Sequence, residues 1–127
     1  MVIGVLVEAA RATPVRQAPD AYGRALAVIA AQCTDPAVTP ATVADHVKLS
    51  LRQLQRLFGA RGTTIERTIR RARVDYAVGL LTDRTCDAMS VDEIARHSGF
   101  AGGSSLARAM AAEGYDSPSR VRRAGQR

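Results

Sequence analysis

The chain has no tryptophan, little aromatic content and no long hydrophobic run. Only 4% of its 127 residues are aromatic. Its longest apolar stretch, Val2 to Val7, ends at Glu8 and is far shorter than the ~20 residues that a membrane helix needs. No basic segment precedes this stretch, so it does not resemble a secretory signal. The sequence therefore predicts no membrane association, and we expect a cytoplasmic protein.

Cysteine is scarce, and its spacing offers no metal site. The two cysteines, Cys33 and Cys86, stand far apart, and neither belongs to a CxxC pair or a Cys/His cluster. This excludes a disulfide scaffold and the usual zinc-binding patterns. We interpret both thiols as buried, small apolar side chains, and we expect no cofactor and no metal.

No arrangement of side chains indicates an enzyme. The two histidines, His46 and His97, have no nucleophile at a spacing that would suggest catalysis, and the sequence contains no phosphate-binding loop. We interpret both histidines as structural, and we do not expect catalytic activity.

Basic charge is abundant and is concentrated in two zones. The net charge is +6, and 17 of the 18 basic residues are arginine. Residues 52–73 hold seven arginines against one glutamate, and residues 108–127 hold five arginines against two acidic residues. The segment between them, residues 74–107, has two basic and five acidic residues. The surplus alone could reflect genome composition, but this clustering is typical of a chain that meets a polyanion at two places.

Capping residues locate the helix starts. Three starts have a hydroxyl side chain followed three residues later by Glu or Gln, the pattern of a capping box, and two have a hydroxyl residue directly before proline. These five predicted starts are Thr39, Ser50, Thr63, Ser90 and Ser117, and Asp20 is a weaker cap for a sixth helix before them. Apolar residues then recur at intervals of three and four, and no convincing strand follows residue 20. The chain is therefore expected to be all-α.

One supersecondary unit occurs twice. Residues 43–49 align with residues 94–100 at an offset of 51, and residues 54–71 align with residues 106–123 at an offset of 52. Each copy has a short helix with a small inner residue (Ala44, Ala95), a tight turn, and a second helix with inward leucine. This is the pattern of a helix-turn-helix, whose second helix can enter a major groove.

The segment between the copies predicts a long helix from Thr64 to about Leu81. Its ~18 residues would span about 27 Å, against the ~34 Å that separates successive major grooves on one face of B-DNA. We predict four parts: residues 1–19 as a linker or remnant, 20–62 as the first subdomain, 63–82 as the linking helix, and 83–127 as the second subdomain with a basic tail.

The outward faces of the second helices supply the candidate base contacts. In the first copy these are Arg52, Gln55 and Arg56, and in the second copy they are Ser104, Ser105 and Arg108. Arginine can bind guanine and glutamine can bind adenine with two hydrogen bonds each. The alternative is that both faces are merely solvated.

Candidate phosphate contacts are the N-cap hydroxyl of Ser50 and two arginine groups at repeat-equivalent places. The arginines are Arg67, Arg70, Arg71, Arg120, Arg122 and Arg123. A purely solubilising role is the alternative. For Arg73 we expect an internal ion pair with a carboxylate such as Glu93 or Asp75. Phe100 and Tyr115 are expected in the core.

Several motifs together resemble one family. They are Val43-Ala44, Ser50-x-x-x-Leu54-x-Arg56-Leu57-Phe58, Gly62-Thr63-Thr64, Arg73-Val74-x-x-Ala77-x-x-Leu80-Leu81, Ser90-x-x-Glu93-Ile94-Ala95-x-x-x-Gly99-Phe100 and Gly114-Tyr115-Asp116-Ser117-Pro118. Over roughly residues 22–123 the chain resembles the DNA-binding domain of the AraC/XylS family of bacterial transcription regulators. The resemblance implies seven helices, promoter DNA as partner, and an activator that contacts RNA polymerase. It also leaves open a missing N-terminal effector-binding domain.

Departures from the family pattern concern mainly the second copy. Lys48 stands where the first turn often has glycine, and Ser98 stands where the second turn has an apolar residue. Leu106 and Met110 replace phenylalanine, and glycines 102 and 103 lie at the start of the second reading helix. We therefore expect the second subdomain to be less tightly packed and the weaker reader of sequence.

The sequence thus predicts a sequence-specific, double-stranded-DNA-binding transcription regulator associated with the nucleoid. The alternative from another class is a basic helical protein-interaction module without sequence-specific DNA binding. Sequence-selective footprints distinguish the two.

Overall fold

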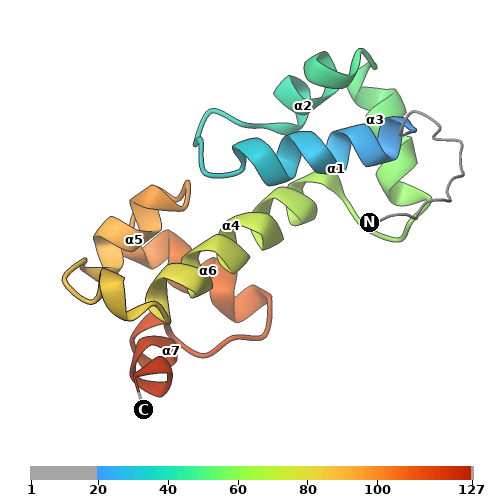
Figure 1. Cartoon of the computed structure of the whole chain (residues 1–127). Helices are drawn as coiled ribbons and strands as arrows, with labels where there is room; N and C mark the ends of the chain where they lie inside the picture. The colour runs from blue at the N-terminus through green and yellow to red at the C-terminus, as the bar shows by residue number, and fades with distance from the viewer. Residues whose placement is uncertain (1–19, 127) are drawn as a thin grey trace, which may run out of the picture.

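The computed structural model describes residues 20–126, which form seven α-helices and one short 3-10 helix without a strand among them (Figure 1). The helices are α1 (Ala21–Gln32), α2 (Pro40–Val47), α3 (Leu51–Gly59), α4 (Ile65–Leu81), α5 (Val91–His97), α6 (Gly103–Ala112) and α7 (Pro118–Gly125), with η2 (Arg84–Cys86) after α4. The all-α prediction is confirmed. The proposed linker or remnant, residues 1–19, lies outside the described residues. Among the helices of residues 20–126, none combines the length and hydropathy needed to cross a bilayer.

Most helix starts lie where the capping residues place them. The Ser50 hydroxyl accepts from the Gln53 amide at 3.1 Å, and the Gln53 side chain accepts from the Ser50 amide at 2.9 Å. Ser90 and Glu93 form the same reciprocal pair. Because the Glu93 carboxylate accepts from the Ser90 amide, the pKa of its side chain lies below the ordinary value.

The start of α4 differs from the prediction by one residue. Thr64, not Thr63, is the N-cap, and its hydroxyl accepts from the Arg67 amide at 3.1 Å. Thr63 is used otherwise, since its amide closes the preceding turn by donating to the Phe58 carbonyl at 3.2 Å. The predicted capping box of Thr63 with Glu66 was therefore wrong, because Thr63 belongs to the turn that ends α3.

The buried residues form two cores, and α4 contributes to both. The first core comprises Ala25, Ile29, Cys33, Val38, Val43, Ala44, Val47, Leu54, Phe58, Ile65 and Ile69. The second core comprises Val74, Ala77, Leu81, Ile94, Ala95, Leu106, Ala109 and Met110. In Figure 1, α1, α2 and α3 lie around the beginning of α4, and α5, α6 and α7 lie around its end. One unbroken helix of 17 residues thus carries two separate helical clusters.

The turn inside each helix-turn-helix shows that the repeat extends to the backbone. Lys48 has φ 62°, and Gly99, its partner in the repeat, has φ 96°. Among the described residues, Lys48 is the one non-glycine residue with a positive φ. The left-handed conformation costs an L-residue about 1–2 kcal/mol. The next residue closes the turn in both copies: Leu49 donates to Ala44 at 3.1 Å, as Phe100 donates to the equivalent carbonyl at 2.9 Å.

The second helix of each copy also ends in the same way. Gly62 (φ 74°) and Gly114 (φ 88°) follow α3 and α6, and each adopts the left-handed conformation. The amide of Tyr115 then donates to the Met110 carbonyl at 2.9 Å, as Thr63 does in the first copy. Equivalent residues therefore make equivalent turns at both ends of both second helices.

Arg73 is half-buried and bonded within the protein, but its partners are not those predicted. Its guanidinium donates to the carbonyls of Cys33 at 2.6 Å, Asp35 at 2.9 Å and Val38 at 3.2 Å. The prediction of an ion pair with a carboxylate such as Glu93 or Asp75 was wrong. Cys33 is the C-cap of α1, and Asp35 and Val38 belong to the loop between α1 and α2, so one long side chain from α4 binds the carbonyls of the helix end and of the loop that follows it. Burial lowers the pKa of the Arg73 guanidinium.

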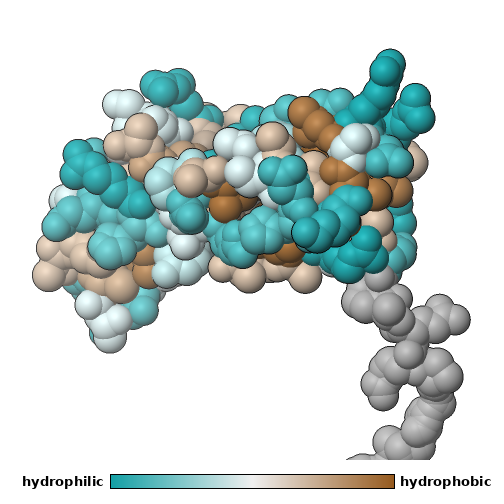
Figure 2. All heavy atoms as spheres, turned by 90° about the horizontal axis from the view of Figure 1, so that it is seen from above, coloured by the Kyte–Doolittle hydropathy of each residue, from teal (hydrophilic) through white to brown (hydrophobic). Residues whose placement is uncertain are grey.

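Of the four side chains expected to be buried, Cys33 and Phe100 are packed in the protein, but Cys86 and Tyr115 are more exposed than predicted. Cys33 is buried, and burial raises the pKa of its thiol. Cys86, in η2, is instead partly exposed. Phe100 packs against the second core as expected, but Tyr115 is 39% exposed. Figure 2 shows hydrophilic residues over most of the face seen from above, with smaller hydrophobic areas between them.

Gly99 is constrained twice, which a matched pair of alanine variants can test. A Cβ at Gly99 would lie 2.7 Å from the Arg73 Nε and 2.8 Å from the Cys33 carbonyl oxygen, whereas a Cβ at Gly114 would meet nothing within 4 Å. Gly114→Ala should lower the free energy of unfolding by about 1 kcal/mol, the cost of a left-handed L-residue. Gly99→Ala should add overpacking and lose about 3 kcal/mol. Urea unfolding followed by circular dichroism measures both, and equal losses would contradict the close approach at Gly99.

Candidate nucleic-acid interface

The polar face of α3 is exposed along its length. Arg52, Gln55 and Arg56 are exposed, and Leu54 and Phe58 on the opposite side are fully buried. Burial of two large side chains at a spacing of four residues fixes the rotation of α3 about its axis. The three predicted base-contacting side chains are therefore held together on one outward face.

The corresponding face of α6 is less polar. Ser104 and Arg108 are exposed and Ser105 is half-buried, whereas Leu106 and Met110 are fully buried. Arg108 is the only long polar side chain among the three candidates of this helix. Two short hydroxyls reach less far from the helix than Arg52 and Gln55 do, so the two candidate reading faces are unequal in reach.

A carboxylate from another helix caps the start of α6. The N-cap, Gly102, has no side chain, and the Asp92 carboxylate accepts from the Gly103 amide at 3.0 Å. Asp92 also forms an ion pair with Arg96 at 2.6 Å. The negative charge lies at the positive end of the α6 dipole. Sequence reasoning missed this contact, because Asp92 is eleven residues from its partner and no local capping pattern predicts it.

The basic side chains predicted to contact phosphates fall into two groups. Within residues 20–126, the side chains of Arg67, Arg120 and Arg123 are exposed and have no ion-pair or hydrogen-bond partner. The others have partners inside the protein. Arg70 and Arg71 pair with Glu113, and Arg122 donates to the Cys86 carbonyl at 3.4 Å, with its buried Nε left unpaired. A phosphate contact of the second group would compete with these interactions.

The arginines of α4 also lie on different sides of that helix. Arg67 and Arg71 line a groove of about 540 Å³ between α1 and α4, together with Tyr22 and Arg61. Arg70 lines a smaller cavity of about 250 Å³ with residues from the start of α2 and with Phe100. In the described chain, no group of three or more His, Cys, Asp or Glu could hold a metal ion.

The fold and these two exposed helix faces define a helix-turn-helix protein with two copies of the motif. A family model described as a helix-turn-helix domain matches residues 43–124, which is more than half of the chain. The chain belongs to this helix-turn-helix family, which is of the AraC type. Membership supports a DNA-binding transcription regulator, and members of the family are generally not enzymes.

The comparison with solved structures agrees on the fold. A crystal structure of a DNA-binding transcriptional dual regulator from Escherichia coli K-12 superposes with a TM-score of 0.74 at 17% sequence identity. The match covers 90% of this chain and 100% of that chain. No curated protein matches the chain. At this low identity the structural likeness concerns the arrangement of the helices.

The cap of α3 can be tested separately from any contact that it makes. Ser50→Ala removes the acceptor for the Gln53 amide and should lower the free energy of unfolding by about 1 kcal/mol. Ser50→Asp keeps a good N-cap acceptor and should leave stability within a few tenths of a kcal/mol of the parent. Thermal unfolding followed by circular dichroism measures both variants. Equal stability of Ser50→Ala and the parent would show that the hydroxyl does not stabilise α3.

Proposed function

We propose that the chain binds double-stranded promoter DNA sequence-specifically by placing α3 and α6 in two successive major grooves. The observation that supports this best is the duplicated motif on one helix: equivalent turns position equivalent second helices, and α4 is anchored in the cores of both. At 1.5 Å per residue α4 is about 26 Å long, which is the scale of the ~34 Å between major grooves on one face of the duplex.

Base contacts in the first groove come from Arg52, Gln55 and Arg56 of α3. Each bidentate pair of arginine with guanine or of glutamine with adenine contributes ~1–3 kcal/mol of discrimination. In the second groove Arg108 reads a base edge, and Ser104 and Ser105 contact waters or phosphates. Because the α6 face has fewer long polar side chains, this box is less sharply defined.

Phosphate contacts orient the chain on the duplex and supply affinity that does not depend on sequence. Ser50 and the arginines without a side-chain partner in residues 20–126, Arg67, Arg120 and Arg123, are the contacts we propose first. Arg70, Arg71 and Arg122 contribute less, because their protein partners must be given up. Ser50→Asp, which keeps the cap, should then lower DNA affinity by adding a negative charge beside a phosphate.

On the family resemblance we further propose that the protein acts in the cytoplasm as a nucleoid-associated activator that contacts RNA polymerase. The same resemblance suggests an effector-binding domain as a functional partner of this one. A transcription assay with purified polymerase on a promoter carrying the selected site tests the activator role. Repression of that promoter would contradict the activator role and indicate a repressor.

Selection of bound duplexes from a random pool tests the proposed DNA reading. We expect two enriched boxes about one helical turn apart, one well defined and one more variable. Two equally sharp boxes would contradict the inequality of α3 and α6. Enrichment of no sequence, together with affinity that falls steeply with salt, would favour the alternative of a basic interaction module.

Arg56 is the most direct single test of base reading. Arg56→Ala should lower affinity for the selected duplex about 10- to 100-fold and relax the preference at one base pair, while affinity for random duplex falls much less. Arg84→Ala is the matched control, because Arg84 is an exposed arginine of η2 outside both reading helices. Fluorescence anisotropy with both duplexes measures these changes. An unchanged base preference in Arg56→Ala would refute the assignment.

A further inference from the structure

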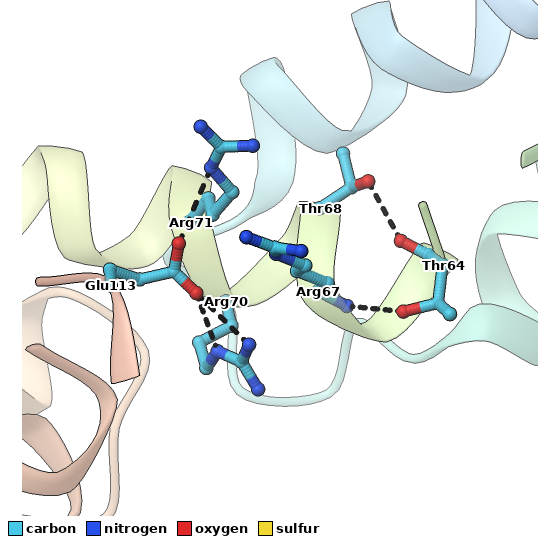
Figure 3. A network of polar contacts seen from close by, with 6 residues as sticks. All are labelled: Thr64, Arg67, Thr68, Arg70, Arg71 and Glu113. Carbon is cyan, nitrogen blue, oxygen red and sulfur yellow. Dashed lines mark hydrogen bonds and ion pairs between the residues drawn. The ribbon is translucent and has the colours of Figure 1, made fainter. Parts of the chain in front are cut away.

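One carboxylate is held between two arginines at the junction of the two helical clusters. Glu113 is the C-cap residue of α6, and its side chain is only 7% exposed. Its Oε2 lies 2.9 Å from the Arg70 Nη2 and accepts from the Arg70 Nε at 3.0 Å. Its Oε1 lies 3.4 Å from the Arg71 Nε. Figure 3 shows Glu113 reaching between the two guanidinium groups, each of which approaches one carboxylate oxygen.

This interaction joins α6, which is packed in the second core, to the part of α4 that follows the first core. Arg70 and Arg71 directly follow Ile69, which is buried in the first core, whereas α6 is packed in the second core through Leu106 and Met110. The carboxylate therefore connects the end of the second reading helix to the part of α4 that is embedded with α1 and α3. No other ion pair found in residues 20–126 joins α6 to that part of α4.

The repeat shows which position in the motif makes this connection. At the offset of 52, Glu113 corresponds to Arg61, and each directly precedes the left-handed glycine that ends its motif. The Arg61 guanidinium lies 3.9 Å from the centre of the Tyr22 ring of α1. In both copies this position ties the second helix to a supporting helix. In the first copy that helix is α1, which belongs to the first core alone, but in the second copy it is α4, which is shared.

Glu113 also lowers the local positive charge on α4. Glu113 neutralises part of the charge of two arginines in the most basic segment of the chain, residues 52–73. Arg70 and Arg71 are 39% and 60% exposed, so both guanidinium groups remain close to solvent. Without the carboxylate they would be available to phosphates.

We propose that Glu113 is a positioning residue that holds α6 at a fixed orientation on α4, and so maintains the spacing between the two DNA boxes, and that it withholds Arg70 and Arg71 from non-specific phosphate contact. The proposal rests on the two-box function proposed above. It makes Glu113 a determinant of specificity that touches no base. Loss of the carboxylate should weaken discrimination between correctly and incorrectly spaced boxes and, at the same time, strengthen binding to unrelated DNA.

The test compares Glu113→Gln with Glu66→Gln in the full chain. Glu66 is an exposed glutamate of the first turn of α4 without an ion pair in the described chain, so its replacement removes the same charge without breaking the connection. Affinities are measured for the duplex selected by the parent chain, for the same duplex with one or two base pairs inserted between the boxes, and for a random duplex.

We expect the insertions to weaken binding of the parent and of Glu66→Gln by at least about 10-fold, because each added base pair rotates and shifts one box relative to the other. For Glu113→Gln the loss should be less than about 3-fold. Its affinity for random duplex should rise about 3- to 10-fold, with a steeper salt dependence, because up to two more phosphates are neutralised. An unchanged insertion penalty in a folded Glu113→Gln variant would overturn the proposal.

Arg70→Gln removes the two closer contacts to Glu113 and leaves the 3.4 Å contact with Arg71, so it weakens the connection from its more exposed side. It keeps the test informative if Glu113→Gln does not fold. It should also reduce the insertion penalty, but it should not raise affinity for random duplex, because it removes a basic group. A raised affinity for random duplex in Arg70→Gln would contradict the second part of the proposal.

A measurement without DNA separates failure of this proposal from failure of the proposed function. Spin labels at Ala60→Cys and Ala111→Cys, both exposed, report the distance between the ends of α3 and α6 in a background of Cys33→Ala and Cys86→Ser. Pulsed electron–electron double resonance should give a narrow distribution of label-to-label distances in this background and a broader one when Glu113→Gln is added. Equal widths would overturn the positioning role even if DNA binding is selective. Lack of any selected DNA sequence, with broadening present, would refute the proposed function instead.

Discussion

The arrangement of this protein depends on the burial of one helix in two hydrophobic cores. Ile65 and Ile69 of α4 are buried with α1, α2 and α3, and Val74, Ala77 and Leu81 are buried with α5 and α6. Within residues 20–126 the two cores share no buried residue, and α4 is the helix that contributes buried side chains to both. The rigidity of an α-helix converts burial at its two ends into a fixed relation between the two cores.

Local sequence patterns predict much of this arrangement. Capping residues at Ser50 and Ser90 placed two helix starts correctly, because the contacts that begin a helix involve side chains three residues apart. The repeat predicted equivalent turns, and it holds in the backbone even at Lys48, which takes the conformation that Gly99 takes in the second copy. The family pattern thus persists where the favoured residue type does not.

What the sequence did not reveal is tertiary. Asp92 caps α6 from another helix, Arg73 binds carbonyls of the C-cap of α1 and of the loop after it, and Glu113 binds arginines more than forty residues away. None of these contacts has a characteristic spacing, since each depends on how helices cross after they have formed. The sequence correctly located basic charge on α4, but it could not show which helices each arginine faces or that Arg70 and Arg71 share one carboxylate. The candidate reading faces were easier to predict, because burial of Leu54 and Phe58 determines which side of α3 faces outward.

We propose that two helix faces, held at one separation, engage one side of a DNA duplex. Hydroxyl-radical footprinting of the full chain on its selected duplex tests this most directly. The account predicts two protected segments about one helical turn apart on the same face of the DNA. A single protected segment, or two segments on opposite faces, would contradict it.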